Sequence, residues 1–595
     1  MNGRLEKLRA RMEQEGVDLY LIPTADFHES EYVSDYFKCR KYVSGFTGSA
    51  GTVVVSRGEA GLWTDGRYFV QAGRQLEGSG ITLFRMGQEG VPTVTRYIAD
   101  HLAQGDTLGF DGRVVSAGLG RELSEMAKER GAAVSCRMDL VGDIWEDRPP
   151  LPDGPVWILD EKYSGRSASE KLKELRADMK AAGACTHVLT TLDDIAWLLN
   201  LRGSDILYTP VFLSYMVVTE NEASLYVDKH KLDDRVSAYL AGLGVSCRGY
   251  EEIYAAVSEL HGRKILLESG KVNFRLLSEI PEDNEILDRM NPTSLRKAVK
   301  NPVEAENERL AHKKDGVALT KFIHWVKTNV GKIPMDEISV DRKLLEFKRQ
   351  QEGFLEQSFA TIAACGSNAA MCHYRASEET KAELLPKGFL LVDCGSQFYE
   401  GTTDVTRTIA LGPLTQEESD CFTLVLCSML RLADTRFLYG CGGLSLDYVA
   451  REVFWRRGLD FNHGTGHGVG YLSCVHERPN GFRWRTLPGS PDLVPFEEGM
   501  ITSDEPGLYF EGKFGIRTEN LLVCVKDFRN EYGQFMKFEH LTCCPIDLDA
   551  VNTELMEPRD KELLNEYHLW VRETIGPFLD PDERQWLHEA TRPVR

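Results

Sequence analysis

The chain has 595 residues, 42% hydrophobic and 27% charged, so it is too long for one hydrophobic core and predicts about three domains. Its formal net charge of −21 argues against nucleic acid or an anionic membrane as its main partner. No stretch approaches the roughly 20 apolar residues of a membrane span, and the N-terminus lacks the apolar core of a signal peptide. Fourteen cysteines without metal-type spacing predict reduced thiols in a cytoplasm.

Residues 1–155 are predicted to form a first α/β domain. We expect Pro92 in the first turn of its helix, because a proline lacks only an N–H that is unpaired there. The glycine cluster over 45–51 lacks the Gly-Lys-Ser/Thr ending of a phosphate loop. A proline cluster over 149–155 marks the end of the domain. The predicted elements are helices over 5–14, 92–102 and 118–130, and strands over 18–22 and 51–56.

Residues 156–300 are predicted to form a second domain of the same type, because helix, strand and hairpin follow one another in both. Asp193 is a candidate N-cap for one of its helices. Neither domain concentrates acids with histidines, so we expect both to be a scaffold for assembly and for shaping a cleft. The predicted elements are helices over 168–182 and 193–199, and strands over 187–190, 215–219 and 223–227.

Residues 301–595 are predicted to form the third domain. Its helices are expected over 304–330, 336–351, 417–433 and 445–457. The first of them carries an apolar stripe of Leu310, Val317, Leu319, Phe322, Ile323 and Val326. A tail over 541–595 contains one amphipathic helix, over 560–575. We expect the tail to pack on the third domain, because its apolar residues need burial: Leu564, Tyr567, Leu569, Trp570 and Ile575.

Four carboxylates and one imidazole of the third domain form a candidate metal-binding set: Asp393, Asp404, His467, Glu505 and Glu519. Such an oxygen-rich, hard set suits divalent manganese, cobalt or zinc rather than copper or an iron–sulfur cluster. Four carboxylates also balance the charge of two divalent ions. The alternative interpretation is that acids beside turns are solvated turn formers.

The spacing of the acids indicates two similar hairpins. A buried strand over 388–392 leads into Asp393, and a returning strand over 405–411 follows Asp404. An aromatic-Glu-Gly turn lies between the two acids at 398–401, and a second such turn at 509–512 precedes Glu519. We interpret this pattern as a diverged internal duplication in which each half supplies two carboxylates to one cleft.

Several motifs resemble known families. The third domain contains LLVDCGSQFYEGTTDVTRT, HGTGHGVG, SDEPG and GIRTEN, which resemble the metal-ligand motifs of metallopeptidases with the pita-bread fold. The first two domains contain IPTADFHESEY, YVSGFTGSAGTVVV, LWTDGRYFVQA and DDIAWLLNLRGSDILYTPVFLSY, which resemble the large three-domain form of the aminopeptidase P family. The resemblance implies two creatinase-like α/β domains and a catalytic domain with a curved antiparallel sheet backed by helices. It also implies a homodimer.

The resemblance implies a role for each candidate ligand. Asp393 would hold one metal ion, His467 and Glu505 the other, and Asp404 and Glu519 would bridge both. Glu505 would also hold the attacking water and pass its proton onward. The ions implied are divalent, with manganese favoured and zinc or cobalt as alternatives.

Three histidines match the non-ligand histidines of the family: His373, His463 and His476. They are expected to orient the substrate and stabilise the oxyanion, although a lone histidine is more often structural. Arg517 is expected either to order the acids or to line the proline pocket, or to be a charge partner only. His463 and His467 are four residues apart, but no glutamate follows the first, so the zincin motif is absent.

The predicted function is removal of the N-terminal residue from peptides with proline in the second position. One alternative is a prolidase limited to X-Pro dipeptides, and another is an inactive peptidase-like binding module. One departure from the family is visible, because the usual His-Glu-Gly-Pro reads His476-Glu477-Arg478-Pro479 here. Arg478 leaves the shape of the prime-side cleft open. Cys394 and Cys474 are interpreted as core thiols.

Overall fold

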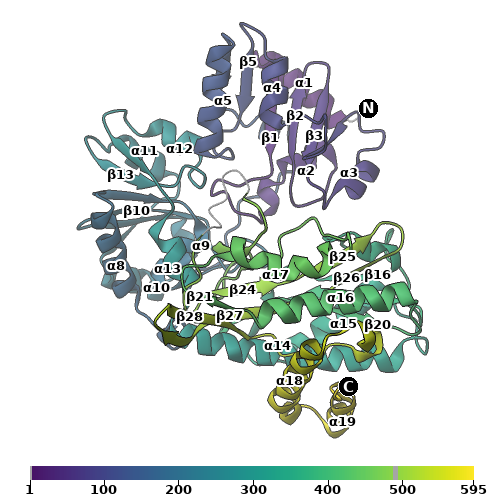
Figure 1. The fold of residues 1–595 in the computed structure, drawn as a ribbon. Coiled ribbons are helices and arrows are strands. Elements are labelled where there is room, and N and C mark those ends of the chain that lie inside the picture. Colours follow the sequence, from purple (N-terminus) through teal and green to yellow (C-terminus); the bar gives the residue numbers. More distant parts are fainter. Residues whose placement is uncertain (1–2, 487–493) are drawn as a thin grey trace. The chain divides into compact units, whose positions relative to one another are not determined.

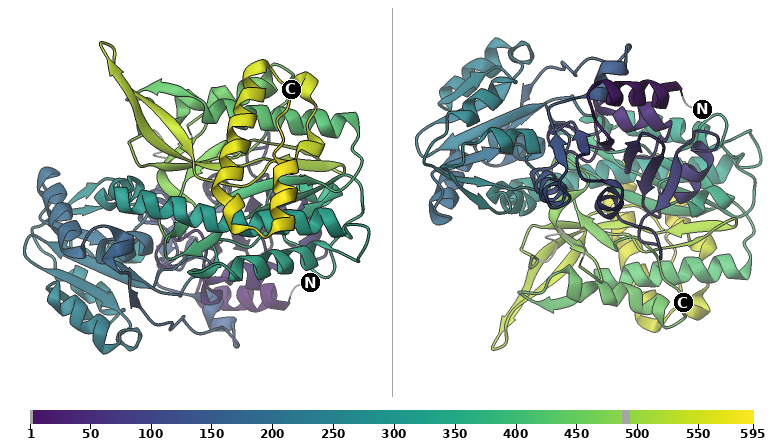
Figure 2. Two further views of the ribbon diagram at one scale, coloured as in Figure 1. Left: turned by 90° about the horizontal axis from the view of Figure 1, so that it is seen from below. Right: turned by 90° about the horizontal axis from the view of Figure 1, so that it is seen from above.

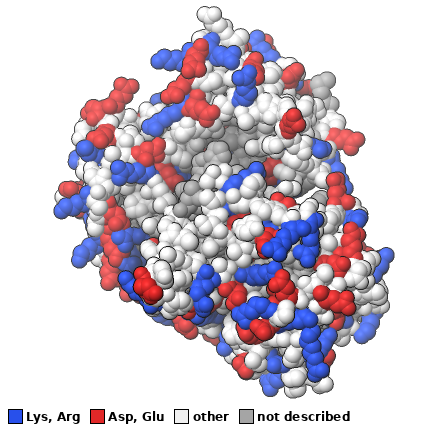
Figure 3. All heavy atoms as spheres, viewed as in Figure 1, with Lys and Arg blue, Asp and Glu red and all other residues white. Residues whose placement is uncertain are grey.

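The chain folds into two compact units in a computed structural model that describes residues 3–486 and 494–595 (Figure 1). Unit 1 comprises Met1–Asp160 and Arg166–Thr293, and unit 2 comprises Glu161–Gly165 and Ser294–Arg595. Acidic and basic side chains are interspersed over the visible surface of both units (Figure 3). The net charge is therefore spread over this face rather than gathered in one patch.

Unit 1 begins with a mixed six-stranded sheet in the order β4-β3-β2-β1-β5-β6. The β1-β2 and β2-β3 pairs are antiparallel, and the other three pairs are parallel. The sheet and its flanking helices are α1 (Gly3–Gln14), β1 (Leu19–Pro23), β2 (Thr52–Ser56), β3 (Ala60–Thr64), β4 (Thr82–Arg85), α4 (Val94–His101), β5 (Thr107–Phe110), α5 (Ala117–Glu129) and β6 (Ala133–Ser135).

The second sheet of unit 1 repeats the first. Its order is β12-β11-β10-β8-β13-β14, with two antiparallel and three parallel pairs at the same positions. The predicted relationship of the two domains is thus confirmed in their topology. The elements are α8 (Ala168–Ala181), β8 (Thr186–Leu189), α9 (Leu192–Leu199), β10 (Ser214–Thr219), β11 (Ala223–Val227), β12 (Val245–Arg248), β13 (Lys264–Leu267) and β14 (Glu285–Asp288).

Two predicted helix starts in unit 1 are wrong. Pro92 lies before the helix, because Thr93 is the N-cap of α4 and its hydroxyl accepts from the backbone N–H of Arg96. Asp193 lies inside the first turn of α9, where Thr191 holds the N-cap position. The carboxylate of Asp193 still stabilises α9 from the first turn, because it interacts favourably with the positive end of the helix dipole.

Unit 2 is built from antiparallel strands covered by helices. A three-stranded sheet has the order β16-β17-β20, and a six-stranded sheet has the order β21-β28-β27-β24-β22-β23. Their strands are β16 (Ile362–Cys365), β17 (Phe389–Cys394), β20 (Val405–Ala410), β21 (Arg436–Leu438), β22 (Gly466–Gly468), β23 (Glu477–Phe482), β24 (Ile501–Asp504), β27 (Asn520–Asn530) and β28 (Gly533–His540). The helices are α14 (Pro302–Asn329), α15 (Glu337–Arg349), α16 (Gln416–Ala433) and α17 (Gly443–Trp455).

The C-terminal tail packs on unit 2, as predicted. It forms α18 (Pro558–Ile575), which crosses α14 and α16, and a further helix, α19 (Pro581–Ala590), which the sequence did not reveal (Figure 2). Leu564, Tyr567 and Ile575 are buried there beside Phe422 and Val425 of α16. The tail is therefore part of the core of this unit.

Two residues predicted to be buried in unit 2 are exposed. Leu569 of α18 is 45% exposed, because it lies on the outer face of that helix. Leu310 of α14 is 42% exposed and lines a cavity. An apolar pattern identifies the inner face of a helix, but it does not show how far the neighbouring elements cover that face.

Candidate metal centre

Two nested hairpins of unit 2 carry the candidate ligands. In the first, β17 pairs with β20 so that Asp393 lies opposite Thr406, and Asp404 directly precedes β20. In the second, β24 pairs with β27, Glu505 directly follows β24, and Glu519 directly precedes β27. A smaller hairpin lies inside each: β18 (Ser396–Phe398) with β19 (Gly401–Thr402), and β25 (Gly507–Phe510) with β26 (Phe514–Arg517). The predicted repeat is thus present in the strand pairing.

The ligand atoms of the candidate set converge. One ligand atom from each of Asp404, His467 and Glu519 lies within 4.8 Å of the others. His467 Nε2 is 3.5 Å from Asp404 Oδ2 and 3.5 Å from Glu505 Oε1. Asp393 is close enough for its charge to raise the pKa of Asp404. The structure therefore brings all five predicted residues together.

The crowded carboxylates hold their protons more tightly than usual. Burial raises the pKa values of Asp404, Glu505 and Glu519, and the neighbouring carboxylates raise them further. Positive charges partly lower the pKa values of two of them: His476 and Arg517 act on Asp404, and His467 and Arg517 act on Glu505. Two divalent cations would supply the missing positive charge, so the donor set fits such ions.

Hydrogen bonds around the set orient its members. His467 Nδ1 is 2.9 Å from the carbonyl oxygen of Gly468, to which it donates, so Nε2 keeps a lone pair toward the acids. The Thr406 hydroxyl donates to Glu519 Oε2 at 2.7 Å. Gly466 lets β22 approach β24, because a Cβ there would lie 1.8 Å from the carbonyl oxygen of Ser503. The imidazole is thus held in the tautomer that a metal ligand needs.

Arg517 forms an ion pair with one of the acids, Asp393. Its guanidinium is 3% exposed and bonds Asp393 through Nη2. Nη1 donates to the Tyr509 hydroxyl at 2.7 Å, and that hydroxyl lies 2.9 Å from His463 Nε2. His463 Nδ1 faces the carbonyl oxygen of Gly464 at 2.7 Å, so Nε2 is the acceptor for Tyr509. A chain of hydrogen bonds thus runs from His463 to Asp393.

Tyr509 and Cys372 are site residues that the sequence did not single out. Tyr509 begins the second aromatic-Glu-Gly turn, and this repeat was the signal that could have identified it. Burial raises the pKa of the Cys372 thiol, while Arg517 and Tyr509 beside it lower that pKa. The next residue in the chain is His373, so the segment carrying this predicted histidine reaches the site.

The remaining candidates lie around the cluster. The His476 ring meets the His467 ring edge-to-face, with centroids 4.3 Å apart. Glu477 points elsewhere, because Lys297 and Lys300 bind its carboxylate at 3.0 and 2.7 Å. Arg478 is half-buried in β23. Cys394 is fully buried in the core, as predicted for a strand neighbour of Asp393.

The fold and the site together define a class of protein, the metallopeptidases of the pita-bread type. Residues 306–526 match the metallopeptidase family M24, and residues 534–594 match the C-terminal region of that family. Residues 4–137 and 147–304 match two models of the creatinase/prolidase N-terminal domain. Over 3–486 and 494–595, every helix is too short or too polar to cross a membrane.

Full-length relatives narrow the class. The chain is 35% identical to aminopeptidase P1 of Arabidopsis thaliana, covering 100% of this chain and 99% of the relative. It is 37% identical to a probable Xaa-Pro aminopeptidase P of Sordaria macrospora, with 99% of each chain covered. A cytosolic X-prolyl aminopeptidase of Caenorhabditis elegans with a di-nuclear active site superposes with a TM-score of 0.94 at 34% identity, covering 100% and 99% of the chains. The chain belongs to the Xaa-Pro aminopeptidase P family.

A more distant structure shares the fold alone. The Xaa-Pro dipeptidase of Bacillus anthracis superposes with a TM-score of 0.52 at 24% identity. The match covers 64% of this chain and 99% of the dipeptidase. The dipeptidase is therefore matched over its whole length by only part of this longer chain.

Proposed function

We propose that this protein is a metalloaminopeptidase that releases the N-terminal residue from peptides with proline in the second position, using two divalent metal ions. The convergence of four carboxylates with His467 in a buried site carries this proposal. Family membership over the whole chain supports the same reaction. Proline lacks an amide N–H and a flexible φ angle, so peptides that contain it need a dedicated site.

We assign the ligands as the family resemblance implies. Asp393 would hold one ion, His467 and Glu505 the other, and Asp404 and Glu519 both. When bound, two divalent ions supply Lewis acidity for the scissile carbonyl and lower the pKa of the attacking water. The Nε2 lone pair of His467 and the hydrogen bond from Thr406 to Glu519 support these roles.

Other side chains would move protons and orient the peptide. Glu505 would accept a proton from the attacking water and pass it to the leaving amine, because its carboxylate lies within the cluster, 3.5 Å from His467 Nε2. We propose that His373, His463 and His476 orient the substrate and stabilise the oxyanion. Arg517 and Tyr509 would hold Asp393 and His463 in place for this chemistry.

We propose manganese as the metal, with zinc and cobalt as alternatives that the same donors accept. The test is metal analysis after purification without chelator, followed by reconstitution with each ion and an assay on Arg-Pro-Pro. We expect about two ions per chain and the highest rate with manganese, in keeping with a dinuclear carboxylate site. An enzyme that is active without metal would contradict the whole assignment.

We further propose that the enzyme acts on longer Xaa-Pro peptides as well as dipeptides. A dipeptidase must close its cleft where the substrate carboxylate ends, usually with a positive charge, and Arg478 is the residue that could do so. Rates on Arg-Pro-Pro and a longer peptide should therefore be compared with the rate on Arg-Pro, in the wild type and in Arg478→Gly. Turnover of dipeptides alone, with longer substrates gained in Arg478→Gly, would identify a prolidase. No turnover of any substrate with metal bound would identify a binding module.

We propose a homodimer formed through an exposed aromatic patch on α17 and the segment that follows β23. Tyr448, Trp455 and Trp484 are 39–55% exposed, and their rings form a row with centroids 6.0 and 5.9 Å apart. Such contiguous exposed aromatic surface is typical of an interface. Light scattering should give twice the 67.0 kDa of one chain, and Trp455→Glu should give one chain. A single-chain mass for the wild type at micromolar concentration would contradict the dimer.

We also propose a cytoplasmic location. All fourteen cysteines are free thiols, and the Caenorhabditis elegans relative is a cytosolic enzyme. Fractionation of the source cells with an antibody to the protein tests this location.

A further inference from the structure

Unit 2 contains a cavity of 580 Å³ that none of the five candidate metal ligands lines. Residues of α14, α16, β28 and α18 line it. Its volume falls within the range of small-molecule sites. The proposed reaction at the metal centre leaves this cavity without a role.

One side of the cavity is apolar. Phe538 of β28 and Leu563 and Trp570 of α18 line it, together with Leu310 of α14. Leu310 is 42% exposed, so its side chain faces an open space instead of a packed neighbour. A bulky apolar group placed here would bury surface on both helices.

The rim of the cavity carries both signs of charge. Arg309 lies 3.4 Å from Glu306 and 3.3 Å from Glu539. Asp434 and Glu566 also line the cavity. Arg559 lies 2.9 Å from Asp434 and 3.5 Å from Glu566. The remaining basic residue is Lys313, whose ammonium lies 4.1 Å from the centre of the Phe578 ring. Because carboxylates and cations alternate, the rim fits a zwitterion better than a ligand of one sign.

His540 lines the cavity and carries one ring N–H. Asn520 Oδ1 accepts from Arg407 Nη2 at 2.8 Å, so Asn520 Nδ2 is the donor to His540 Nδ1 at 3.1 Å. The ring proton of His540 is therefore on Nε2. Burial and, to a smaller extent, the charge of Arg407 lower the pKa of His540 to about 4, so the ring is neutral at pH 7. A carbonyl or carboxylate oxygen of a ligand can accept from this Nε2–H.

Two residues that line the cavity, His540 and Tyr567, contact residues that hold the backbone of Glu519. His540 bonds Asn520, the residue that follows Glu519 in the chain. Tyr567 accepts from Arg407 Nη2 at 2.8 Å, and Arg407 Nη1 donates to the carbonyl oxygen of Glu519 at 2.6 Å. A ligand that shifts either ring therefore acts on the backbone that places a predicted bridging carboxylate.

We propose that this cavity is an effector site for a free amino acid or short peptide with a bulky apolar side chain, and that its occupancy changes turnover at the metal centre. The side chain would lie against Trp570 and Phe538. The ammonium group would face the rim carboxylates. The carboxylate or carbonyl oxygen would accept from His540 Nε2–H and meet Lys313.

The test uses L-leucine and L-phenylalanine as probes on the manganese-loaded full chain. Trp570→Leu removes the aromatic wall, and Leu569→Ala is the matched control on the outer face of the same helix. Titration calorimetry should show binding that weakens at least tenfold in Trp570→Leu and stays unchanged in Leu569→Ala. Initial rates on Arg-Pro-Pro should show that the probe changes kcat at saturating substrate in the wild type and in Leu569→Ala but not in Trp570→Leu.

Competition at the metal centre is distinguishable, because it raises KM without changing kcat and persists in Trp570→Leu. Binding that is equal in Trp570→Leu, or a kcat that the probe leaves unchanged in the wild type, would overturn the proposal. If Trp570→Leu does not fold, Lys313→Gln on the opposite wall replaces it with the same expectations. Basal activity without probe is measured in every variant, so failure of the effector site is separate from failure of the proposed function.

Discussion

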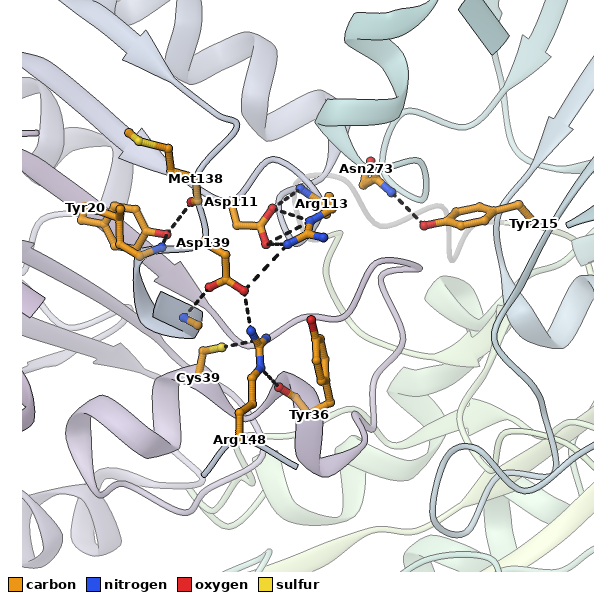
Figure 4. Close-up of polar contacts among 12 residues, drawn as sticks. Tyr20, Tyr36, Cys39, Asp111, Arg113, Met138, Asp139, Arg148, Tyr215 and Asn273 are labelled. Carbon is orange, nitrogen blue, oxygen red and sulfur yellow. Dashed lines mark hydrogen bonds and ion pairs between the residues drawn. The ribbon is translucent and has the colours of Figure 1, made fainter. Parts of the chain in front are cut away.

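Both units contain a repeated structure, but the two repeats differ in how their buried carboxylates are paired with positive charge. In unit 1 each buried or half-buried aspartate that Figure 4 shows has its own arginine. Arg113 binds Asp111 at 3.0 Å, and Arg148 binds Asp139 at 2.5 Å and stacks on Tyr36 at 3.7 Å. These acids are neutralised within the fold.

The repeat in unit 2 brings four carboxylates together with one arginine. Arg517 binds only Asp393 among them, and the others keep raised pKa values. These two aspartates of unit 1 are thus neutralised by side chains of the fold, whereas the acids of the second repeat would need cations from solution. This difference can be tested separately in each unit.

Removal of Glu519, which we propose as a bridging carboxylate, should give the largest effect. We expect Glu519→Ala to lower kcat/KM on Arg-Pro-Pro at least about 10³-fold, or about 4 kcal/mol of transition-state stabilisation, because both ions lose a ligand. Metal content should fall while circular dichroism is unchanged. Glu511→Ala, at the exposed turn of the same hairpin, is the control and should keep full activity. A fully active Glu519→Ala enzyme would refute the ligand assignment.

Chelation should destabilise unit 2 and leave unit 1 unchanged. Ligand binding at about 1,000 times its Kd stabilises a folded state by about 4 kcal/mol, and this contribution is lost when the ions are removed. In scanning calorimetry, the chelator should lower the Tm of the unit 2 transition by several degrees. Added manganese should restore this Tm. An equal decrease in both transitions would show that the units do not differ in this way.

Glu29 is an acid of unit 1 that, unlike Asp111 and Asp139, has no ion pair with an arginine among the described residues. Burial raises its pKa to about 8, its Oε1 has no hydrogen-bond partner among the described residues, and its backbone φ is 56°. Its folded pKa lies above the unfolded value of 4.5, so it imposes no cost below about pH 4.5 and a growing cost up to pH 8. We expect Glu29→Gln to stabilise unit 1 by about 2 kcal/mol at pH 8 and by almost nothing at pH 4.5.

Denaturant unfolding at both pH values measures this change. Activity should be unaffected, because Glu29 is not in the unit that carries the site. A gain of the same size at both pH values would show that the carboxyl charge is not its cause.

The link between the tail and the metal centre should give the smallest effect. Tyr567→Phe removes the hydroxyl that accepts from Arg407 and donates to backbone carbonyls of the 542–544 segment. We expect a loss of about 1.5 kcal/mol in the stability of unit 2, the usual value for buried hydrogen bonds. Tyr532→Phe, at a side chain that is 74% exposed, should change stability by less than about 0.5 kcal/mol. Equal effects of the two variants would exclude a structural role for the Tyr567 hydroxyl.

The sequence by itself determined most of the elements and predicted the members of the proposed site. Periodicity located most of the predicted helices and strands to within about two residues, because each helix or strand must present an apolar face. The two aromatic-Glu-Gly turns predicted the nested hairpins, because a turn and its flanking strands are local in the chain. The helix starts at Pro92 and Asp193 were wrong, because neighbouring threonines occupy the cap positions.

Only the tertiary structure decided how the site is held. Arg517 and Asp393 are 124 residues apart in the chain, and Arg407 and Tyr567 are 160 apart. No local pattern encodes such pairs, because they depend on which strand edge and helix face meet after folding. The same reason applies to the tautomer of His467, the place of Tyr509, the exposure of Leu310 and Leu569, and the cavity beneath α18. Each of these features depends on the distance between separate elements. The spacing of residues along one element gives no information about that distance.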